Sequence, residues 1–161
     1  MSRYKMPIMI VALLLISGVL GNHVYQTRIT YSLHDLVMDY VNEAKIESIF
    51  LKKFMSGDNE GNNYAHITDN KQIELVMSTL QDIRVRNDFS ASNFPEYPAY
   101  LLSFYGEKGD LVSYIMSEGG EILLHGYADS SNKSFRTIDD THQKQLKLLN
   151  QCLEEQSGGT S

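Results

Sequence analysis

The chain has 161 residues and a net charge of −6, and Arg3 and Lys5 are the only charged residues before Arg28. Without residues 1–27, the remaining 134 residues carry a net charge of −8. A length of 134 residues is enough for one domain and too short for two of ordinary size. This negative charge repels phosphate backbones, so we expect no nucleic-acid partner. The single cysteine excludes a disulfide within the chain.

Residues 1–27 begin with two basic residues and continue as an apolar run, Met6–Leu20. This pattern targets a chain to membrane translocation, and the positive-inside rule keeps the N-terminus in the cytoplasm. We predict a single-pass anchor over residues 6–25, because the uncharged stretch extends beyond the run and the best cleavage site, Val19-Leu20-Gly21, lacks the usual alanines. A cleaved signal and a secreted domain are the alternative, because the run is shorter than the roughly 20 residues of a spanning helix.

The region after the anchor begins with a predicted helix over residues 32–44, where apolar residues recur at helical spacing and Ser32 occupies the N-cap position. Residues 45–55 fit two structures. As a strand, this segment would have Ile46, Phe50 and Phe54 on one face. As a helix, it would have the same residues and Ile49 at helical spacing. The content of Ile and Phe favours the strand.

Residues 56–63 are a polar loop, followed by a second predicted helix that begins at Asp69 with Gln72 three residues later, a capping-box pattern. Its apolar stripe includes Leu80. Residues 87–98 contain two of the three prolines and are predicted to form a long connection.

Three short strands with glycine-containing turns between them are predicted over residues 100–105, 111–117 and 121–127. Residues 135–137 are a candidate fourth strand. A third helix is predicted from Asp139 or Asp140, with Gln143 as the capping partner of Asp140 and with Leu146, Leu149, Cys152 and Leu153 on its inner face.

These elements predict an α+β fold: a three- to four-stranded antiparallel meander packed by helices, within one extracytoplasmic domain over residues 28–155. A meander that curls towards a half-barrel around the second helix is the alternative. Residues 156–161 contain no apolar residue and are predicted to be a disordered tail. The position of Cys152 on an inner helix face favours a buried thiol over pairing with a second chain.

No motif predicts a metal or catalytic site. The segment that begins at Asp58 resembles a calcium loop, but Asn63 replaces the required glycine and Asp69 the final glutamate, so a polar turn is favoured. The five histidines lack zinc-type spacing, and we expect surface or hydrogen-bonded side chains, with His142 at the surface. His66 and His125 both fall in strand-like segments and could meet across the sheet. No serine has the sequence context of a nucleophile.

The tyrosines of the meander are the one suggestive set, because aromatic residues on an exposed sheet face favour protein or glycan binding. They are Tyr100, Tyr105, Tyr114 and Tyr127. We expect most of them to belong to the core or its edge. Asn132-Lys133-Ser134 matches an N-glycosylation sequon, which matters only in a eukaryotic source. The sequence thus predicts no catalytic, cofactor-binding or metal-binding residue and no cofactor.

The arrangement also resembles a group of proteins. Four segments resemble small uncharacterised exported or membrane-anchored proteins of Gram-positive bacteria. They are Ile46–Phe54, His66–Ile73 at a helix start, Tyr100–Phe104 and the meander that ends at Ile138–Asp140. The resemblance covers roughly residues 46–153. It implies a strand–helix–meander–helix domain behind a membrane segment, and it implies no activity and no functional residues.

The export signal and the missing catalytic motifs lead us to expect a non-enzymatic, membrane-tethered extracytoplasmic module at the cell membrane. Its expected partners are the membrane, through residues 6–25, and another envelope protein or a glycan. The alternative is a secreted or envelope hydrolase whose active-site residues are scattered along the sequence. A cleft that brings together His66, His125 and a carboxylate would favour the hydrolase.

Overall fold

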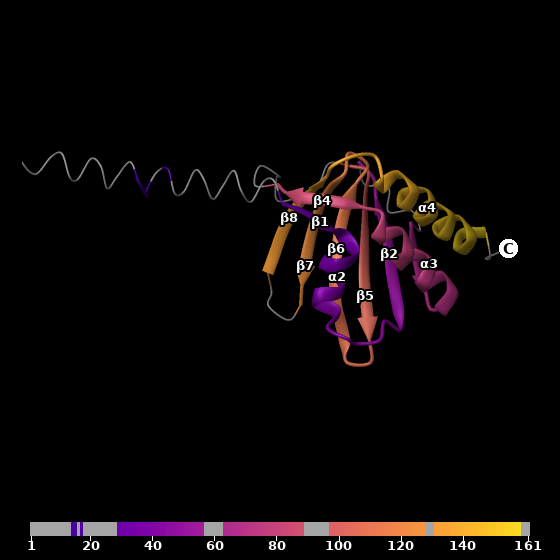
Figure 1. Cartoon of the computed structure of the whole chain (residues 1–161). Coiled ribbons are helices and arrows are strands. Elements are labelled where there is room, and N and C mark those ends of the chain that lie inside the picture. Colours follow the sequence, from indigo (N-terminus) through magenta and orange to yellow (C-terminus); the bar gives the residue numbers. More distant parts are fainter. Residues whose placement is uncertain are drawn as a thin grey trace, which may run out of the picture.

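The computed structural model describes residues 29–56, 63–88, 97–127 and 131–158, together with Leu14, Leu15 and Ser17. From residue 29 onward, the described residues form eight strands and three helices, an α+β domain (Figure 1). In chain order the elements are β1 (Thr30–Ser32), α2 (Leu33–Val41), β2 (Ser48–Phe54), β3 (Tyr64–Ile67), α3 (Asn70–Gln81), β4 (Arg84–Asn87), β5 (Ala99–Gly106), β6 (Gly109–Ser117), β7 (Glu121–Gly126), β8 (Ser131–Thr137) and α4 (His142–Gly158).

The eight strands form one sheet in the order β1-β4-β8-β7-β6-β5-β2-β3, and every neighbouring pair is antiparallel. The α+β class is therefore confirmed, but the predicted sheet of three or four strands is wrong. The predicted meander forms the centre of the sheet as β5 to β8. On one side β2 and β3 extend it, and on the other β4 and β1 do so.

The strands outside the predicted elements of the sheet, β1, β3 and β4, are only 3 or 4 residues long. β4 contains one buried apolar residue, Val85, between exposed Arg84 and Arg86. Its partner β8 is distant in the chain, so no hairpin pattern marks the pairing. For residues 45–55 the preferred strand is confirmed, because β2 pairs with both β3 and β5.

The core lies between one face of the sheet and the three helices. Side chains alternate across a strand, so every second residue of each central strand points to the helices. On α2 the buried residues are Leu33, Val37 and Val41, and α3 and α4 contribute further buried apolar residues to the same cluster. The sheet contributes Ile49, Leu51, Ala65, Ile67, Val85, Tyr100, Leu102, Phe104, Val112, Tyr114, Met116, Ile122, Leu124 and Phe135.

The start of α3 agrees with the prediction, and the starts of α2 and α4 differ from it. The Asp69 side chain caps α3 by accepting a hydrogen bond of 3.0 Å from the Gln72 backbone N–H, as the capping pattern predicts. Ser32 precedes α2 at the N-cap position, but its side chain makes no capping hydrogen bond. Before α4, the Asp139 carboxylate accepts hydrogen bonds from the N–H and hydroxyl of Thr141, the residue that precedes the helix. The Gln143 N–H donates to the backbone oxygen of Asp140 at 3.0 Å.

His142 anchors the start of α4 to the turn between β6 and β7. Its ring is buried, with 3% of the residue exposed, and Nε2–H donates to the backbone oxygen of Glu118 at 3.0 Å. Gly120 in this turn has φ +80°, and a Cβ there would collide with the Thr137 hydroxyl, so the turn and helix pack without room for a side chain. The expectation of a surface position for His142 is therefore wrong.

The predicted anchor over residues 6–25 lies outside the described residues except for Leu14, Leu15 and Ser17. Among the described residues, no helix has the length and apolar character needed to cross a membrane. The start of the calcium-like segment, residues 58–62, and most of the predicted connection, residues 89–96, also lie outside the described part of the chain. α4 continues to Gly158, so it includes the first three residues of the predicted tail.

Candidate functional site

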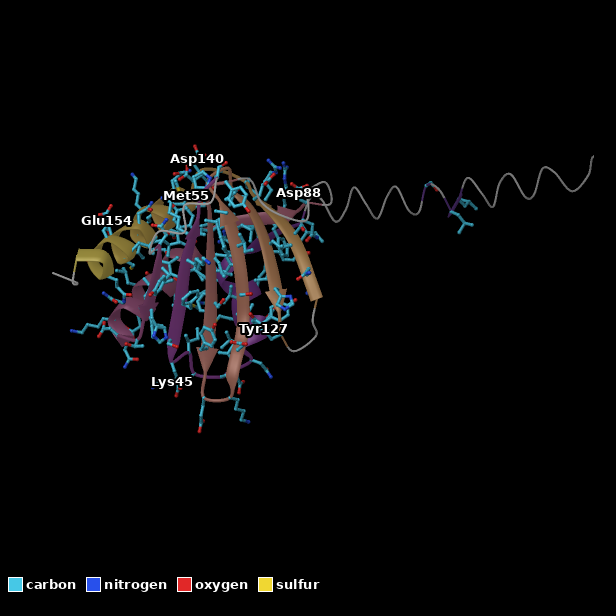
Figure 2. The ribbon with its side chains drawn as sticks, turned by 180° about the vertical axis from the view of Figure 1, so that it is seen from behind. Lys45, Met55, Asp88, Tyr127, Asp140 and Glu154 are labelled. Carbon is cyan, nitrogen blue, oxygen red and sulfur yellow. The ribbon has the colours of Figure 1, made fainter. Side chains whose placement is uncertain are left out.

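The face of the sheet opposite the core carries none of the described helices. Figure 2 views this face, with the central strands in front and α2 behind them. We call it the open face. It is formed by the residues that alternate with the core residues along each strand, and it is the one large surface of the sheet that the helices leave accessible.

The strand register arranges the residues of the open face in rows across the sheet. The first row consists of His66, Phe50, Ser103, Ser113, His125 and Asn132, from β3 to β8. The second row consists of Tyr64, Lys52, Leu101, Ile115, Leu123 and Ser134 on the same six strands.

The centre of the open face is apolar where a solvent-facing sheet surface is usually polar. Leu101, Ile115 and Leu123 are neighbours on β5, β6 and β7 and are only half-buried. In the adjacent row, Ser103 and Ser113 lie side by side and are only 5% and 6% exposed. An antiparallel sheet with one solvated face normally alternates apolar and polar residues, and a contiguous apolar patch marks an interaction surface.

An open pocket of about 450 Å³ lies at the β3 end of this face. Its volume falls within the range of roughly 300 to 1,000 Å³ that is typical of ligand sites. Five residues from three strands line it: Ser48, Phe50, Tyr64, His66 and Tyr105. The rings of Phe50 and Tyr64 lie nearly parallel, at 25°, with centroids 6.1 Å apart.

Tyr105 supplies a phenol that stays protonated. Burial raises its pKa, the nearby Asp110 carboxylate raises it further, and a hydrogen bond between Tyr105 and Ser103 lowers it by less. The hydroxyl of Tyr105 is thus a hydrogen-bonding group over the whole physiological pH range. The Asp110 carboxylate also makes this side of the pocket unfavourable for an anion.

The outer edge of β3 is occupied by a side chain from α4. The Lys53 N–H donates to the Asn63 oxygen at 2.7 Å, so the alternation of an antiparallel pair turns the backbone groups of His66 away from β2. Gln156 binds both of them: its Oε1 accepts from the His66 N–H at 3.0 Å, and its Nε2 donates to the His66 oxygen at 2.9 Å. The amide of Gln156 thus closes this edge at His66 against another strand.

His66 and His125 do not meet. They lie in the same row on the open face, but β2, β5 and β6 separate β3 from β7. Four strand spacings of about 4.8 Å place them about 19 Å apart. His125 binds Asn132 instead, with Nδ1–H donating to Oδ1 at 2.7 Å, and its ring packs edge-on against Tyr127.

The four meander tyrosines divide evenly between the two faces. Tyr100 and Tyr114 are fully buried in the core, whereas Tyr105 and Tyr127 lie on the open face. Tyr127, labelled in Figure 2, is 39% exposed. Aromatic residues are therefore available at both the β3 and β7 sides of the open face.

Phe50 and Tyr64 are site residues that the sequence did not predict. The sequence pattern places Phe50 and Ile46 on one strand face, and in the structure the residues of β2 that enter the core are Ile49 and Leu51, on the other face. The available signal was the alternation of Ile49 and Leu51 with Phe50 and Lys52, which makes both faces of β2 partly apolar.

An ion-pair cluster lies at the other end of the open face. Arg136 donates from Nε to Asp88 and from Nη2 to Glu121, each at 2.8 Å. The hydrogen bond to Asp88 raises the pKa of Arg136, and both carboxylates are mostly buried, with 12% and 16% of their side chains exposed. These contacts connect β8 to β7 and to the residue after β4, so the charges of Arg136, Asp88 and Glu121 have a structural role.

The described residues contain no group of three or more His, Cys, Asp or Glu side chains placed to hold a metal ion. Cys152 is a buried free thiol, as its position on the inner face of the third helix predicts, and burial raises its pKa. A raised pKa leaves a cysteine mostly as the unreactive thiol.

No protein-family model, curated protein or solved structure matches this chain.

Proposed function

We propose that the chain is a membrane-tethered extracytoplasmic binding module that holds its ligand on the open face. The observation that carries this proposal is the apolar centre of that face, together with the aromatic pocket beside β3. Covering an apolar surface of this kind with a ligand removes it from water, which lowers the free energy and favours binding. The basic and apolar segment at residues 1–27 supports an extracytoplasmic location and a membrane anchor.

The geometry gives less support to a hydrolase. That function would require His66, His125 and a carboxylate in one cleft, but three strands separate the two histidines on the open face. His142, the most buried histidine of the described residues, is used to hold the start of α4.

Site-specific photo-crosslinking tests where the ligand binds. The full chain is expressed in its own host with a benzophenone amino acid in place of Tyr64 or Tyr127 on the open face, or in place of Leu75 on α3. Leu75 is a matched control because it is 50% exposed, close to the 53% of Tyr64, and lies on the opposite side of the molecule. We expect adducts from Tyr64 and Tyr127 and none from Leu75. No adduct from either tyrosine position, or equal adducts from Leu75, would contradict the proposal.

Fractionation of the same cells tests the tether. We expect the full chain in the membrane pellet after an alkaline wash, because residues 6–25 form the predicted anchor. A soluble fragment that begins near Asn22 would instead establish cleavage and a secreted module.

A further inference from the structure

The pocket beside β3 combines aromatic rings with hydrogen-bonding side chains. The aromatic rings come from Phe50, Tyr64 and Tyr105. Ser48 supplies a hydroxyl, and His66 supplies an imidazole. Phe50 and Tyr64 are nearly parallel, and Tyr64 is 53% exposed, so the pair presents an accessible apolar surface at the mouth of the pocket. Ligand sites in proteins commonly have this composition, an apolar lining with a few polar groups that fix orientation.

The charges around the pocket disfavour an anionic ligand. None of the five residues that line it carries a carboxylate, ammonium or guanidinium group. The ammonium of Lys52, the nearest cation on β2, lies 5.2 Å from the centroid of the Phe54 ring, towards the other end of the strand. Asp110 lies near Tyr105, and the chain as a whole is acidic. A phosphate or carboxylate ligand would therefore find no cation among the residues that line the pocket.

A purely apolar ligand or a quaternary ammonium also fits less well. Either could pack on Phe50 and Tyr64, but neither has a group that bonds to the hydroxyls of Ser48 and Tyr105 or to the imidazole of His66. Binding such a ligand would remove these groups from water without replacing their hydrogen bonds, which is unfavourable.

An extended peptide is disfavoured by the closed edge of β3. A peptide that adds to a sheet edge gains its affinity from backbone hydrogen bonds. At His66 both backbone groups already bind the side-chain amide of Gln156. The occupant of the pocket must therefore lie on the open face rather than continue the sheet.

We propose that this pocket binds a neutral sugar ring, an inference that rests on the proposed binding function and names its ligand class. A pyranose has an apolar C–H face that packs on the rings of Phe50 and Tyr64, and hydroxyls around its rim that bond to Ser48, His66 and Tyr105. The pocket is open to solvent, so it accommodates a ring within a longer neutral glycan.

The test uses the purified full chain in a polyoxyethylene detergent, because glycoside detergents would compete for the pocket. The probes are four neutral tetrasaccharides: chitotetraose, cellotetraose, maltotetraose and mannotetraose. Calorimetry and saturation-transfer NMR measure binding. We expect at least one of the four to bind with a Kd of about 1 mM or below.

Variants then locate the site. Tyr64→Ala should weaken binding by about tenfold or more, because it removes half of the aromatic platform, whereas Tyr64→Phe should keep most of the affinity. Tyr97→Ala is the matched control: it removes another tyrosine of similar exposure, 50% against 53% for Tyr64, and should leave the Kd unchanged within about twofold. Tyr97 precedes β5, whereas the pocket residue Tyr105 lies near the end of that strand. Because Tyr64 is largely exposed, Tyr64→Ala is expected to fold, which the unchanged circular dichroism of the variant checks.

Three results would overturn the sugar assignment: no binding of any tetrasaccharide at 10 mM, about as high as calorimetry allows; binding that Tyr64→Ala leaves unchanged; or tighter binding of choline or of N-acetyl-phenylalanine amide at the same pocket. The proposed function stands or fails separately. A protein adduct at position 64 without tetrasaccharide binding would keep the binding module and replace the sugar with a protein partner. Absence of any adduct at positions 64 and 127 would contradict the binding module itself.

Discussion

The two faces of the sheet are built from alternate residues of the same strands, yet they differ in what covers them. On the helix side, Leu102 and its neighbours are fully buried against α2, α3 and α4. On the open face, Leu101 and its neighbours are equally apolar but only half-buried. The difference indicates that burial in the core does not explain the apolar residues of the open face. Apolar residues that form a contiguous patch on an accessible surface are typical of a contact surface.

The test with the largest expected change in stability compares two adjacent residues of β5. Leu102→Ala empties a fully buried site and should lower the free energy of unfolding by about 2 to 5 kcal/mol. Leu101→Ala removes the same atoms from the open face and should cost about 1 kcal/mol, because water already contacts that side chain. Urea unfolding of the two variants measures both values. Equal losses would show that the open face is part of the core and is covered within the folded chain.

The next test concerns a buried polar contact across the core between α4 and β6. Gln145 donates from Nε2 to the hydroxyl of Tyr114, both side chains are fully buried, and Gln145 Oε1 has no partner among the described residues. Burial raises the pKa of Tyr114, so its phenol remains neutral. Tyr114→Phe should cost about 1 to 3 kcal/mol, because it leaves the Gln145 amide buried without its acceptor.

A double-mutant cycle sharpens this second test. Tyr114→Phe combined with Gln145→Met removes both polar partners and keeps an apolar side chain at each position. The double variant should therefore recover most of the stability lost by Tyr114→Phe. Additive losses in thermal unfolding would mean that the two groups do not depend on each other.

The third test compares two histidines on opposite sides of the sheet. His142→Ala should cost about 1 to 3 kcal/mol, because it removes a buried ring and the donor to the Glu118 carbonyl. His125→Ala should stay within about 0.5 kcal/mol, since the contact of His125 with Asn132 is solvent-exposed. Chemical denaturation midpoints decide the order, and a reversed order would contradict the division into a structural and an accessible face.

Local patterns predict the elements of this fold better than their assembly. Helical spacing located all three helices of residues 29–158, and turn glycines located β5 to β7. Asp69 caps α3 as its spacing to Gln72 predicts. These features depend on residues a few positions apart, so the sequence contains the information directly.

The extent of the sheet and the candidate site depend on pairings between distant segments. Whether Phe50 or Ile49 enters the core is decided by the register with β5, where Ile49 faces Phe104. A shift of one residue would exchange the two faces, and the sequence of β2 alone is apolar on both. Gln156 reaches His66 from a segment that composition predicts to be disordered. The pocket is therefore formed by contacts that no local pattern encodes.

The smallest expected effect lies at the start of α4, on the helix side of the molecule. Hydrogen bonds from the hydroxyl and N–H of Thr141 lower the pKa of Asp139 below its ordinary value of 3.8. A pKa that is lower in the folded state than in the unfolded chain means that the carboxylate stabilises the fold above about pH 4, and that this contribution is lost as the pH falls through the folded-state pKa. The melting temperature of Asp139→Asn should therefore lie slightly below that of the wild type at pH 7, and the difference should shrink below pH 3.8. Thr141→Val, which removes the hydroxyl donor, should produce a smaller change with the same pH dependence. A difference that increased towards acid pH would contradict this and mean that the charged carboxylate opposes folding.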